Sequence, residues 1–219
     1  MDVIYAHSEV ALVAAAGEGS NHGLPGVTNI HRTVKYQAHA CGGVLVAIPG
    51  RPSLSIQKSR WVSRGWTYQE AVLARRRLVF TQDQVYFECC STNCCESIYS
   101  PLDFLHRNDK ASFRNFVRSG HFTGFNSITG FRSFSSIQCD TQPTFTEYLV
   151  HVENFSQREL SHQSDSLNAF RGTIRKYGHM FMGSLCQIWG LGLRYDDKDL
   201  GPTTLGLSLT WKNVSTAYS

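Results

Sequence analysis

The segment Arg60-Trp-Val-Ser-Arg-Gly-Trp-Thr-Tyr-Gln-Glu70 (RWVSRGWTYQE) places two tryptophans, two arginines and a glutamate within eleven residues. Residues 68–76, which overlap its end, are largely good helix formers. Two runs rich in strand formers follow at residues 77–81 and 84–89, and the two residues between them can form a tight turn. The sequence therefore predicts a helix that leads directly into a β-hairpin.

Glu70 has a structural interpretation. Thr67-Tyr-Gln-Glu70 matches the capping box S/T-x-x-E, in which Thr67 accepts a hydrogen bond from the amide of Glu70 and the Glu70 carboxylate accepts one from the amide of Thr67. Trp66 and Ala71 would then occupy the positions of a hydrophobic staple. This role explains Trp66, Thr67 and Glu70 together, and we weigh it above a chemical one.

Glu70 also has a chemical interpretation. Trp66, Glu70 and Leu73 are spaced i, i+4 and i+7, so a helix that extends back to Trp66 would partly desolvate the carboxylate. A desolvated carboxylate beside an arginine, for which Arg60 and Arg64 are the candidates, has a shifted pKa and can act in acid–base chemistry. No second catalytic group follows at a fixed spacing, so Glu70 is named only as a candidate catalytic residue.

The start of the chain suggests one helix–strand unit of an α/β sheet. Residues 2–7 are expected to be helical, and the apolar run at residues 10–16 is typical of a strand buried on both faces in a parallel sheet. Residues 17–26 contain four glycines and a proline and predict a surface loop, because the glycines do not fit the G-x-G-x-x-G spacing of a phosphate-binding loop. A unit that begins at residue 1 lacks neighbours to cover it, so we expect a truncated start.

The second half of the chain is predicted to be mainly helical. Residues 107–143 have no lasting hydrophobic period and are expected to be irregular with short helices. Helices are predicted at residues 143–154 and 164–177, the second with Leu167, Phe170 and Ile174 on one face. A strand or short helix is expected at residues 205–211.

The predicted fold class is α/β or α+β. We expect a partial, mostly parallel sheet flanked by helices, with a β-hairpin, followed by a mainly helical C-terminal region. Residues 1–100 are expected to form the first part of the fold. Because no linker rich in proline or glycine follows, residues 101–219 are expected to be a helical or irregular continuation packed on it.

Composition excludes several classes of protein. The chain has 219 residues, of which 42% are hydrophobic and 17% charged, as in a globular protein. Its net charge of +4 includes one dense basic run, at residues 75–77, which is too little for the basic stripe of a nucleic-acid-binding protein. No uninterrupted apolar stretch of about 18 residues and no signal peptide is present, so we expect no membrane span and a cytoplasmic location.

The seven cysteines are an odd number without a secretory signal, which favours free thiols. Cys90 and Cys94 have C-x3-C spacing within the cluster Cys89, Cys90, Cys94 and Cys95, but a structural zinc site needs four ligands. A second pair would have to come from His106, His121 or Cys139, at no recognisable spacing, so no metal is expected and the role of the cluster stays open. Neither G-x-S-x-G nor H-E-x-x-H occurs, which argues against hydrolases of those kinds.

Residues 59–89, SRWVSRGWTYQEAVLARRRLVFTQDQVYFEC, resemble the third signature block of the heterokaryon-incompatibility (HET) domain of filamentous fungi. That pattern runs R-x-W-T-x-Q-E, a short spacer, S-x-R, and a strand-like stretch that ends in an aromatic residue and Cys. The matching positions are Arg64, Trp66, Thr67, Gln69, Glu70, Arg75 or Arg76, Phe80, Phe87 and Cys89, whereas Ala74 replaces the serine of S-x-R. The resemblance extends over residues 1 to about 95 and, more loosely, from about 145 to 211.

The resemblance implies a function. The first two HET blocks, Ser-Tyr-x-Trp-Gly and Trp-Ile-Asp-x-x-Cys-Ile-x-Gln, are absent, so residues 1–100 are similar to the C-terminal half of a HET domain. We therefore expect an intracellular module of fungal nonself recognition, linked to regulated cell death. It would act through protein partners or self-association and without a cofactor.

The resemblance also implies an alternative. The HET domain has been likened to the Toll/interleukin-receptor fold, some members of which cleave NAD with a helix glutamate. The alternative is therefore a fragment of an NAD-cleaving enzyme that uses Glu70. A decayed reading frame with a partial fold is a third interpretation.

Overall fold

The computed structural model describes residues 1–27, 29–32, 37–47, 50–89, 92–98, 120–122, 145–180, 185–188 and 191–194. The described helices and strands are, in chain order, α1 (Asp2–His7), β1 (Ala11–Ala14), the 3-10 helix η1 (Ser20–His22), β2 (Gln37–Ala40), β3 (Gly43–Val46), α2 (Pro52–Gln57), α3 (Arg60–Ser63), α4 (Thr67–Leu73), β4 (Arg76–Phe80), β5 (Val85–Cys89), β6 (Asn93–Cys95), α8 (Phe145–Ser156), the 3-10 helix η2 (Gln163–Asp165), α9 (Ser166–Met180), β7 (Leu185–Ile188) and β8 (Leu191–Arg194).

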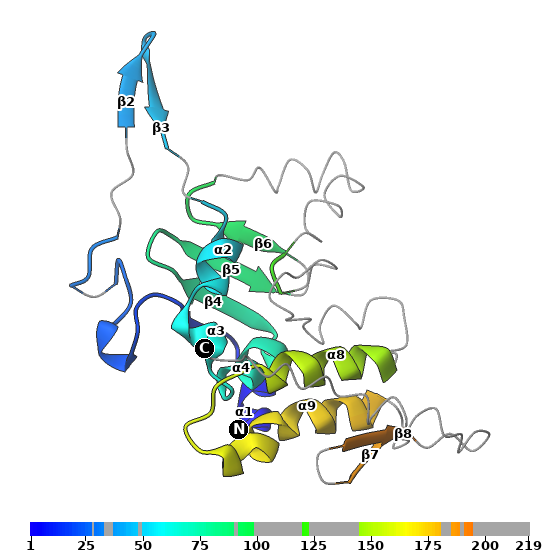
Figure 1. The fold of residues 1–219 in the computed structure, drawn as a ribbon. Coiled ribbons are helices and arrows are strands. Elements are labelled where there is room, and N and C mark those ends of the chain that lie inside the picture. Colours follow the sequence, from blue (N-terminus) through cyan, green and yellow to red (C-terminus); the bar gives the residue numbers. More distant parts are fainter. Residues whose placement is uncertain are drawn as a thin grey trace, which may run out of the picture.

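A four-stranded sheet in the order β1-β4-β5-β6 forms the centre of the described fold (Figure 1). β1 pairs with β4 in parallel, whereas β4 with β5 and β5 with β6 are antiparallel. The hydroxyl of Thr81 donates to the carbonyl of Gln84 at 2.7 Å and accepts from its amide at 3.1 Å, which closes the turn between β4 and β5. The predicted hairpin is thus confirmed.

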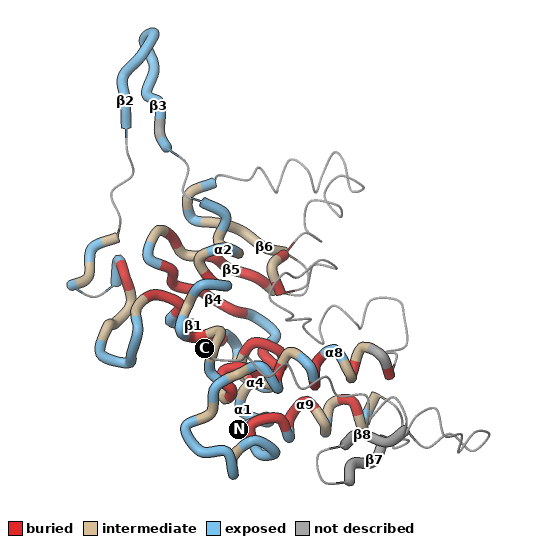
Figure 2. Tube along the Cα trace, viewed as in Figure 1, coloured by how far each residue is buried: buried red, intermediate tan, exposed pale blue. Residues whose placement is uncertain are grey.

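The antiparallel pair β2–β3 projects away from the sheet (Figure 1), and its described side chains are exposed along the whole hairpin (Figure 2). The sequence analysis did not predict it. Its turn places both Cys41 and Gly42 at positive φ, 51° and 77°. Such a turn is typical of two-residue hairpin loops, but a cysteine at its first position is an uncommon signal.

β1 is an outer strand with one buried face. Ala11 and Val13 are buried, whereas Leu12 between them is 57% exposed. The prediction that this strand is buried on both faces is therefore wrong. Within the described part of the chain, β4 is its one neighbour in the sheet, and no described element covers the face that carries Leu12.

α4 is the central helix, and all of its residues except Glu70 are buried. α1 and α9 contact it, and α8 and α9 lie side by side below the sheet in Figure 1. The Gln69 Nε2 atom donates to the backbone carbonyls of Asn168 and Ala169 at 2.9 and 2.8 Å. A Cβ atom at Gly172 would lie 2.4 Å from Gln69 Oε1, so the missing side chain at Gly172 lets α9 approach α4 closely.

Aromatic side chains fill the space between α4 and the two long helices. The Tyr68 hydroxyl lies 2.6 Å from His151 Nδ1, and the Tyr68 ring is 5.7 Å from the Phe155 ring and 6.0 Å from the Phe170 ring. The guanidinium of Arg158 lies 4.8 Å from the centre of the Tyr68 ring, at cation–π distance. α8 and α9 are therefore attached to α4 by one shared core.

A buried arginine joins the sheet to α4. Arg77 on β4 is fully buried, and its guanidinium donates from Nε to the Ala71 carbonyl at 2.7 Å and from Nη2 to the Ala74 carbonyl at 2.6 Å, at the end of α4. Directly across the hairpin lies Glu88, also fully buried, which accepts hydrogen bonds from the Tyr86 hydroxyl and the Phe122 amide. Burial lowers the pKa of Arg77 to about 10, and the charge of Glu88 opposes that change.

The predicted fold class is confirmed, with a mixed sheet where a mostly parallel one was expected. The predicted helix at residues 2–7 is confirmed, and the two long helices occur with ends two or three residues later than predicted. On α9, Phe170 is buried and Ile174 packs on the core, but Leu167 is exposed because the buried face runs through Ala169, Thr173 and Tyr177.

Some predictions lie outside the described residues or stay untested. The strand or short helix at residues 205–211 and most of the irregular region at residues 107–143 are outside the described residues. The division of the fold at residue 100 stays a prediction. The described helices α8 and α9 do pack on the first part of the chain, through α4 and α1.

Replacement of Arg77 by methionine should lower the free energy of unfolding by about 3–5 kcal/mol, because it leaves Glu88 as a buried charge without its cross-strand partner. Urea denaturation of the purified chain measures this. Arg75→Met, which removes an exposed arginine two positions away, should stay within about 0.5 kcal/mol of wild type. The double change Arg77→Met with Glu88→Gln should recover part of the loss. Equal effects of Arg75→Met and Arg77→Met would contradict the role assigned to the buried pair.

Candidate functional site

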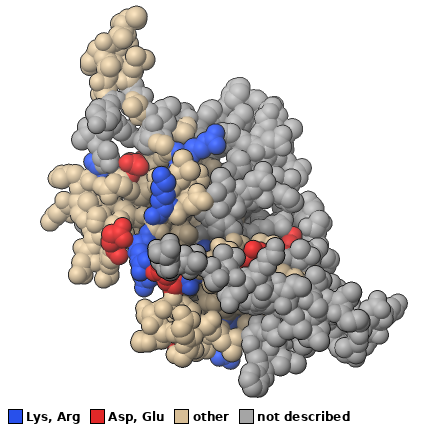
Figure 3. Space-filling model, viewed as in Figure 1, with Lys and Arg blue, Asp and Glu red and all other residues tan. Residues whose placement is uncertain are grey.

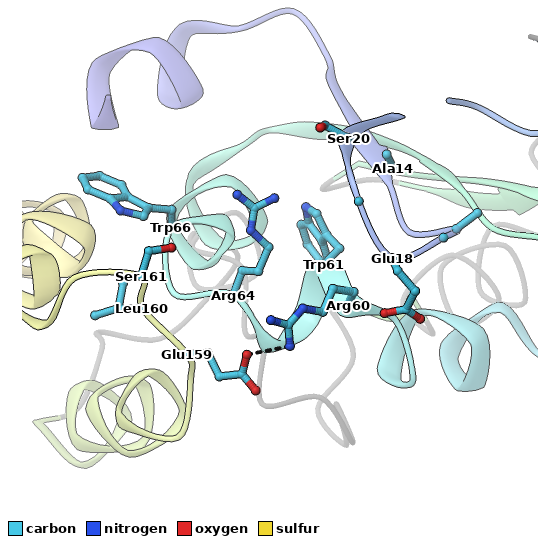
Figure 4. Close-up of a pocket in the computed structure, with 13 residues that line it drawn as sticks. Ala14, Glu18, Ser20, Arg60, Trp61, Arg64, Trp66, Glu159, Leu160 and Ser161 are labelled. Atoms are coloured by element: carbon cyan, nitrogen blue, oxygen red, sulfur yellow. Dashed lines mark ion pairs between the residues drawn. The ribbon is translucent and has the colours of Figure 1, made fainter. Parts of the chain in front are cut away.

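The described residues form a cleft of about 520 Å³ at the carboxyl end of β1, hereafter the β1 cleft (Figure 4). One wall is the loop that follows β1, and a second is the segment from α3 to the start of α4. The third wall is the connection between α8 and α9. The lining residues are Ala14, Ala16, Gly17, Glu18, Gly19, Ser20, Arg60, Trp61, Arg64, Trp66, Glu159, Leu160 and Ser161. Ligands of α/β proteins commonly bind outside the carboxyl ends of the strands, so this is a suitable place for a site.

The loop after β1, whose glycines do not have phosphate-loop spacing, borders the β1 cleft. Gly17 has a φ of 77°, and a Cβ atom there would lie 2.1 Å from the His22 ring, so only glycine fits the turn. A Cβ atom at Gly19 would meet no heavy atom within 4 Å. The backbone of this loop therefore faces open space at Gly19.

The connection between α8 and α9 is bound through backbone hydrogen bonds to residues 60–70 (RWVSRGWTYQE), hereafter the signature segment. The Gly65 amide donates to the Glu159 carbonyl at 2.8 Å, and the Glu159 amide donates to the Ser63 carbonyl at 2.7 Å. Leu160 packs so closely that a Cβ atom at Gly65 would lie 2.5 Å from its Cδ2 atom. Residues almost 100 positions apart thus form one continuous wall.

Two arginines of the β1 cleft differ in their partners. Arg60 Nη1 lies 2.5 Å from Glu159 Oε2, which forms an ion pair at the mouth of the cleft. Arg64 is exposed, and among the described residues it has no ion pair within 4 Å. Figure 4 shows its guanidinium between the indoles of Trp61 and Trp66. On the face seen in Figure 3, arginines and lysines gather over the region of α3 with acidic side chains directly beside them.

Glu70 lies behind the wall of the β1 cleft and does not line it. Its Oε2 atom accepts a hydrogen bond of 3.1 Å from the indole N–H of Trp61. Burial raises the pKa of Glu70 above its ordinary value of 4.5, and the Trp61 hydrogen bond and the charges of Arg64 and Arg77 oppose the rise. The carboxyl group is desolvated, as the chemical interpretation required, but Trp61 separates it from the cleft.

The capping-box prediction is wrong. The N-cap of α4 is Trp66, which makes no side-chain capping bond, and Thr67 is the first helical residue. The Thr67 hydroxyl donates to the carbonyls of Trp61 and Arg64, at 2.5 and 2.8 Å. Glu70 bonds to an indole instead of the backbone because the turn of α3 brings Trp61 against α4.

The structure separates the predicted site residues into two groups. Arg64 and Trp66 line the β1 cleft, whereas Thr67, Gln69 and Glu70 hold the local structure through hydrogen bonds. At the position assigned to Arg75 or Arg76 both side chains are exposed, Arg76 in an ion pair with Glu9, and the buried arginine is Arg77. Sequence reasoning also missed Glu159 and the role of Trp61 in the cleft.

The described cysteines of the cluster lie at the far strands of the sheet. Cys89 ends β5 and Cys94 and Cys95 lie on β6, and all three have free thiols, whereas Cys90 is outside the described residues. Burial raises the pKa of the Cys94 and Cys95 thiols. Within the described ranges, no three histidine, cysteine or acidic side chains are grouped so as to hold a metal ion.

Comparison with known protein families finds a match to the first third of the chain. The family model "Heterokaryon incompatibility protein (HET)" matches residues 1–70, which include α1, β1, the loop after β1 and the signature segment up to Glu70. This match confirms the resemblance to the HET domain over residues 1–70, and the looser resemblance beyond Glu70 stays a prediction. No curated protein and no solved structure matches the chain. In the part of the chain that the structure describes, every helix is too short or too polar to cross a membrane.

The placement of Glu70 predicts a pH dependence of stability. Because its folded-state pKa is raised, the folded protein holds this proton more tightly than the unfolded chain, and stability falls as the pH rises from about 4.5 through the raised pKa. Glu70→Gln should remove this fall, so the variant should gain on wild type as the pH rises. Urea denaturation between pH 4.5 and 7.5 measures the difference.

Two further variants test the origin of that dependence. Trp61→Phe removes the hydrogen bond that lowers the pKa of Glu70 and should enlarge the fall in stability with pH. Glu153→Gln, on the exposed side of α8, controls for the loss of one carboxylate. A Glu70→Gln variant whose difference from wild type does not change with pH would rule out a desolvated carboxyl at this position.

Proposed function

We propose that the chain is a module of fungal nonself recognition, linked to regulated cell death in the cytoplasm, which acts through protein partners or self-association. The HET match supports a function related to heterokaryon incompatibility. The observation that carries the proposal is the signature segment itself. It lies within the HET match, and through Gln69 and Tyr68 it is bonded into the core formed with α8 and α9.

Exposed apolar surface supports action through protein partners or a second copy. Val3 and Ile4 on α1 and Leu12 on β1 are 59%, 64% and 57% exposed. A second group, Val44 and Leu45, is at the projecting β2–β3 hairpin. Contiguous apolar patches on a protein surface commonly mark sites of protein–protein contact.

The proposal is tested by placing the chain in one of two otherwise compatible fungal strains, under an inducible promoter. Fused cells should then take up a vital dye that living cells exclude, whereas fusions without induction should exclude it. The Arg171→Gln variant, which changes an exposed residue of α9, should cause death of the fused cells as wild type does. The Arg77→Met variant should not, because loss of the buried arginine destabilises the protein. Viable fusions in the presence of folded, induced protein would refute the proposal.

A second candidate function is cleavage of NAD that depends on Glu70. The observation that favours it is the desolvated Glu70 carboxyl, one hydrogen bond behind a tryptophan that lines a cleft of ligand size. In this case the purified chain should consume NAD, and Glu70→Gln should abolish turnover while Glu153→Gln leaves it unchanged. Turnover that survives in Glu70→Gln, or none in wild type, would remove this candidate.

A further inference from the structure

We propose that the β1 cleft binds a small ligand that joins one anionic group to a flat aromatic ring, as in a nucleoside monophosphate. The anionic group would bond to Arg64 and the ring would stack on the indole of the partly buried Trp66. Only binding is proposed. The inference does not depend on a role in cell death or on cleavage of NAD.

Arg64 provides the charge for the anion. Its neighbour Arg60 is already neutralised by Glu159, whereas Arg64 has no ion pair within 4 Å among the described residues. The Glu70 carboxyl is near enough for Arg64 to lower its pKa, but it is bonded to Trp61. The planar guanidinium of arginine suits bidentate bonds to phosphate or carboxylate oxygens.

Trp66 provides the surface for the ring, whereas Trp61 is 7% exposed and borders the cleft as part of its wall. Both line the β1 cleft, and in Figure 4 the Arg64 guanidinium lies between them, so an anion on Arg64 would carry an attached ring alongside an indole. Trp61 is held in place by its hydrogen bond to Glu70 and by edge-to-face contact with Phe122 at 6.3 Å. This side of the cleft is therefore fixed before a ligand binds, which reduces the entropy lost on binding.

The size and charge of the cleft limit the ligand. A volume of about 520 Å³ lies within the usual range of small-molecule sites and holds a mononucleotide. Glu18 also lines the cleft, and Figure 4 shows it on the far side of Trp61 from Arg64. One free cation with a carboxylate beyond it favours a single anionic group over a polyphosphate tail. The monophosphate should therefore bind more tightly than the triphosphate.

Isothermal titration calorimetry of the purified full chain tests the proposal with AMP, adenosine, inorganic phosphate and ATP. AMP should bind. Adenosine, which lacks the phosphate, and inorganic phosphate, which lacks the aromatic ring, should each bind at least about tenfold more weakly than AMP. ATP should bind more weakly than AMP. Undetectable binding of AMP at millimolar concentration, or ATP binding tighter than AMP, would overturn the assignment.

Three variants assign the contacts. Arg64→Gln should weaken AMP binding by about tenfold or more and leave adenosine binding unchanged, because it removes the charged partner of the phosphate. Trp66→Leu should weaken AMP and adenosine alike, by roughly tenfold. Arg171→Gln, which removes an exposed arginine from α9, should bind AMP as wild type does. If Arg64→Gln and Arg171→Gln bind AMP equally, the proposal fails.

The wild-type chain supplies a test that does not rely on the variants folding. Added potassium chloride should weaken AMP binding and leave adenosine binding almost unchanged, because only the phosphate contact is screened. An AMP affinity that does not respond to salt would overturn the proposal. Cell death without AMP binding, or the reverse, separates this inference from the proposed function.

Discussion

The Arg77 guanidinium determines how the sheet and the helices of this fold fit together. Arg77 is a residue of β4, and its guanidinium donates to two carbonyls at the end of α4. Glu88 lies opposite Arg77 in the hairpin. The carbonyls at the end of a helix carry partial negative charge, so a buried cation stabilises them, and its charge also interacts with that of Glu88. Because α4 also carries Gln69 and Tyr68, its position on the sheet decides where α8 and α9 pack and where the walls of the β1 cleft meet.

Much of the fold follows from local sequence signals. The hairpin at β4 and β5 was predictable because two runs of strand formers flank a two-residue turn, and the long helices were predictable from composition and period. The cap of α4 was not, since the residue that bonds to Glu70 is Trp61, on a separate helix. The buried side of β4 was predictable because successive side chains of a strand point to opposite faces, which places Arg77 and Val79 on the same face. The exposed β1 face could not, because burial depends on which elements cover a strand.

The candidate site was predictable in part. The signature pattern drew attention to Arg64 and Trp66, which line the β1 cleft, but it did not separate them from Thr67 and Gln69, which hold the structure. The difference lies in side-chain direction and burial, which spacing alone does not give. Glu159 could not be predicted at all, because its place beside Arg60 depends on a backbone pairing between segments far apart in the chain. The HET match ends at Glu70 and so contains no residue of that third wall.

That distant pairing has a consequence for synthesis of the chain. Gln69 bonds to carbonyls 99 and 100 positions downstream, and such non-local contacts form only after the loop between them has closed. At translation rates of about 5–20 residues per second, the ribosome needs roughly 5–20 s to deliver those partners after residue 69. During that interval the apolar side of α4 that packs on α9 stays exposed to solvent. The nascent chain is therefore a suitable substrate for chaperones that bind hydrophobic segments.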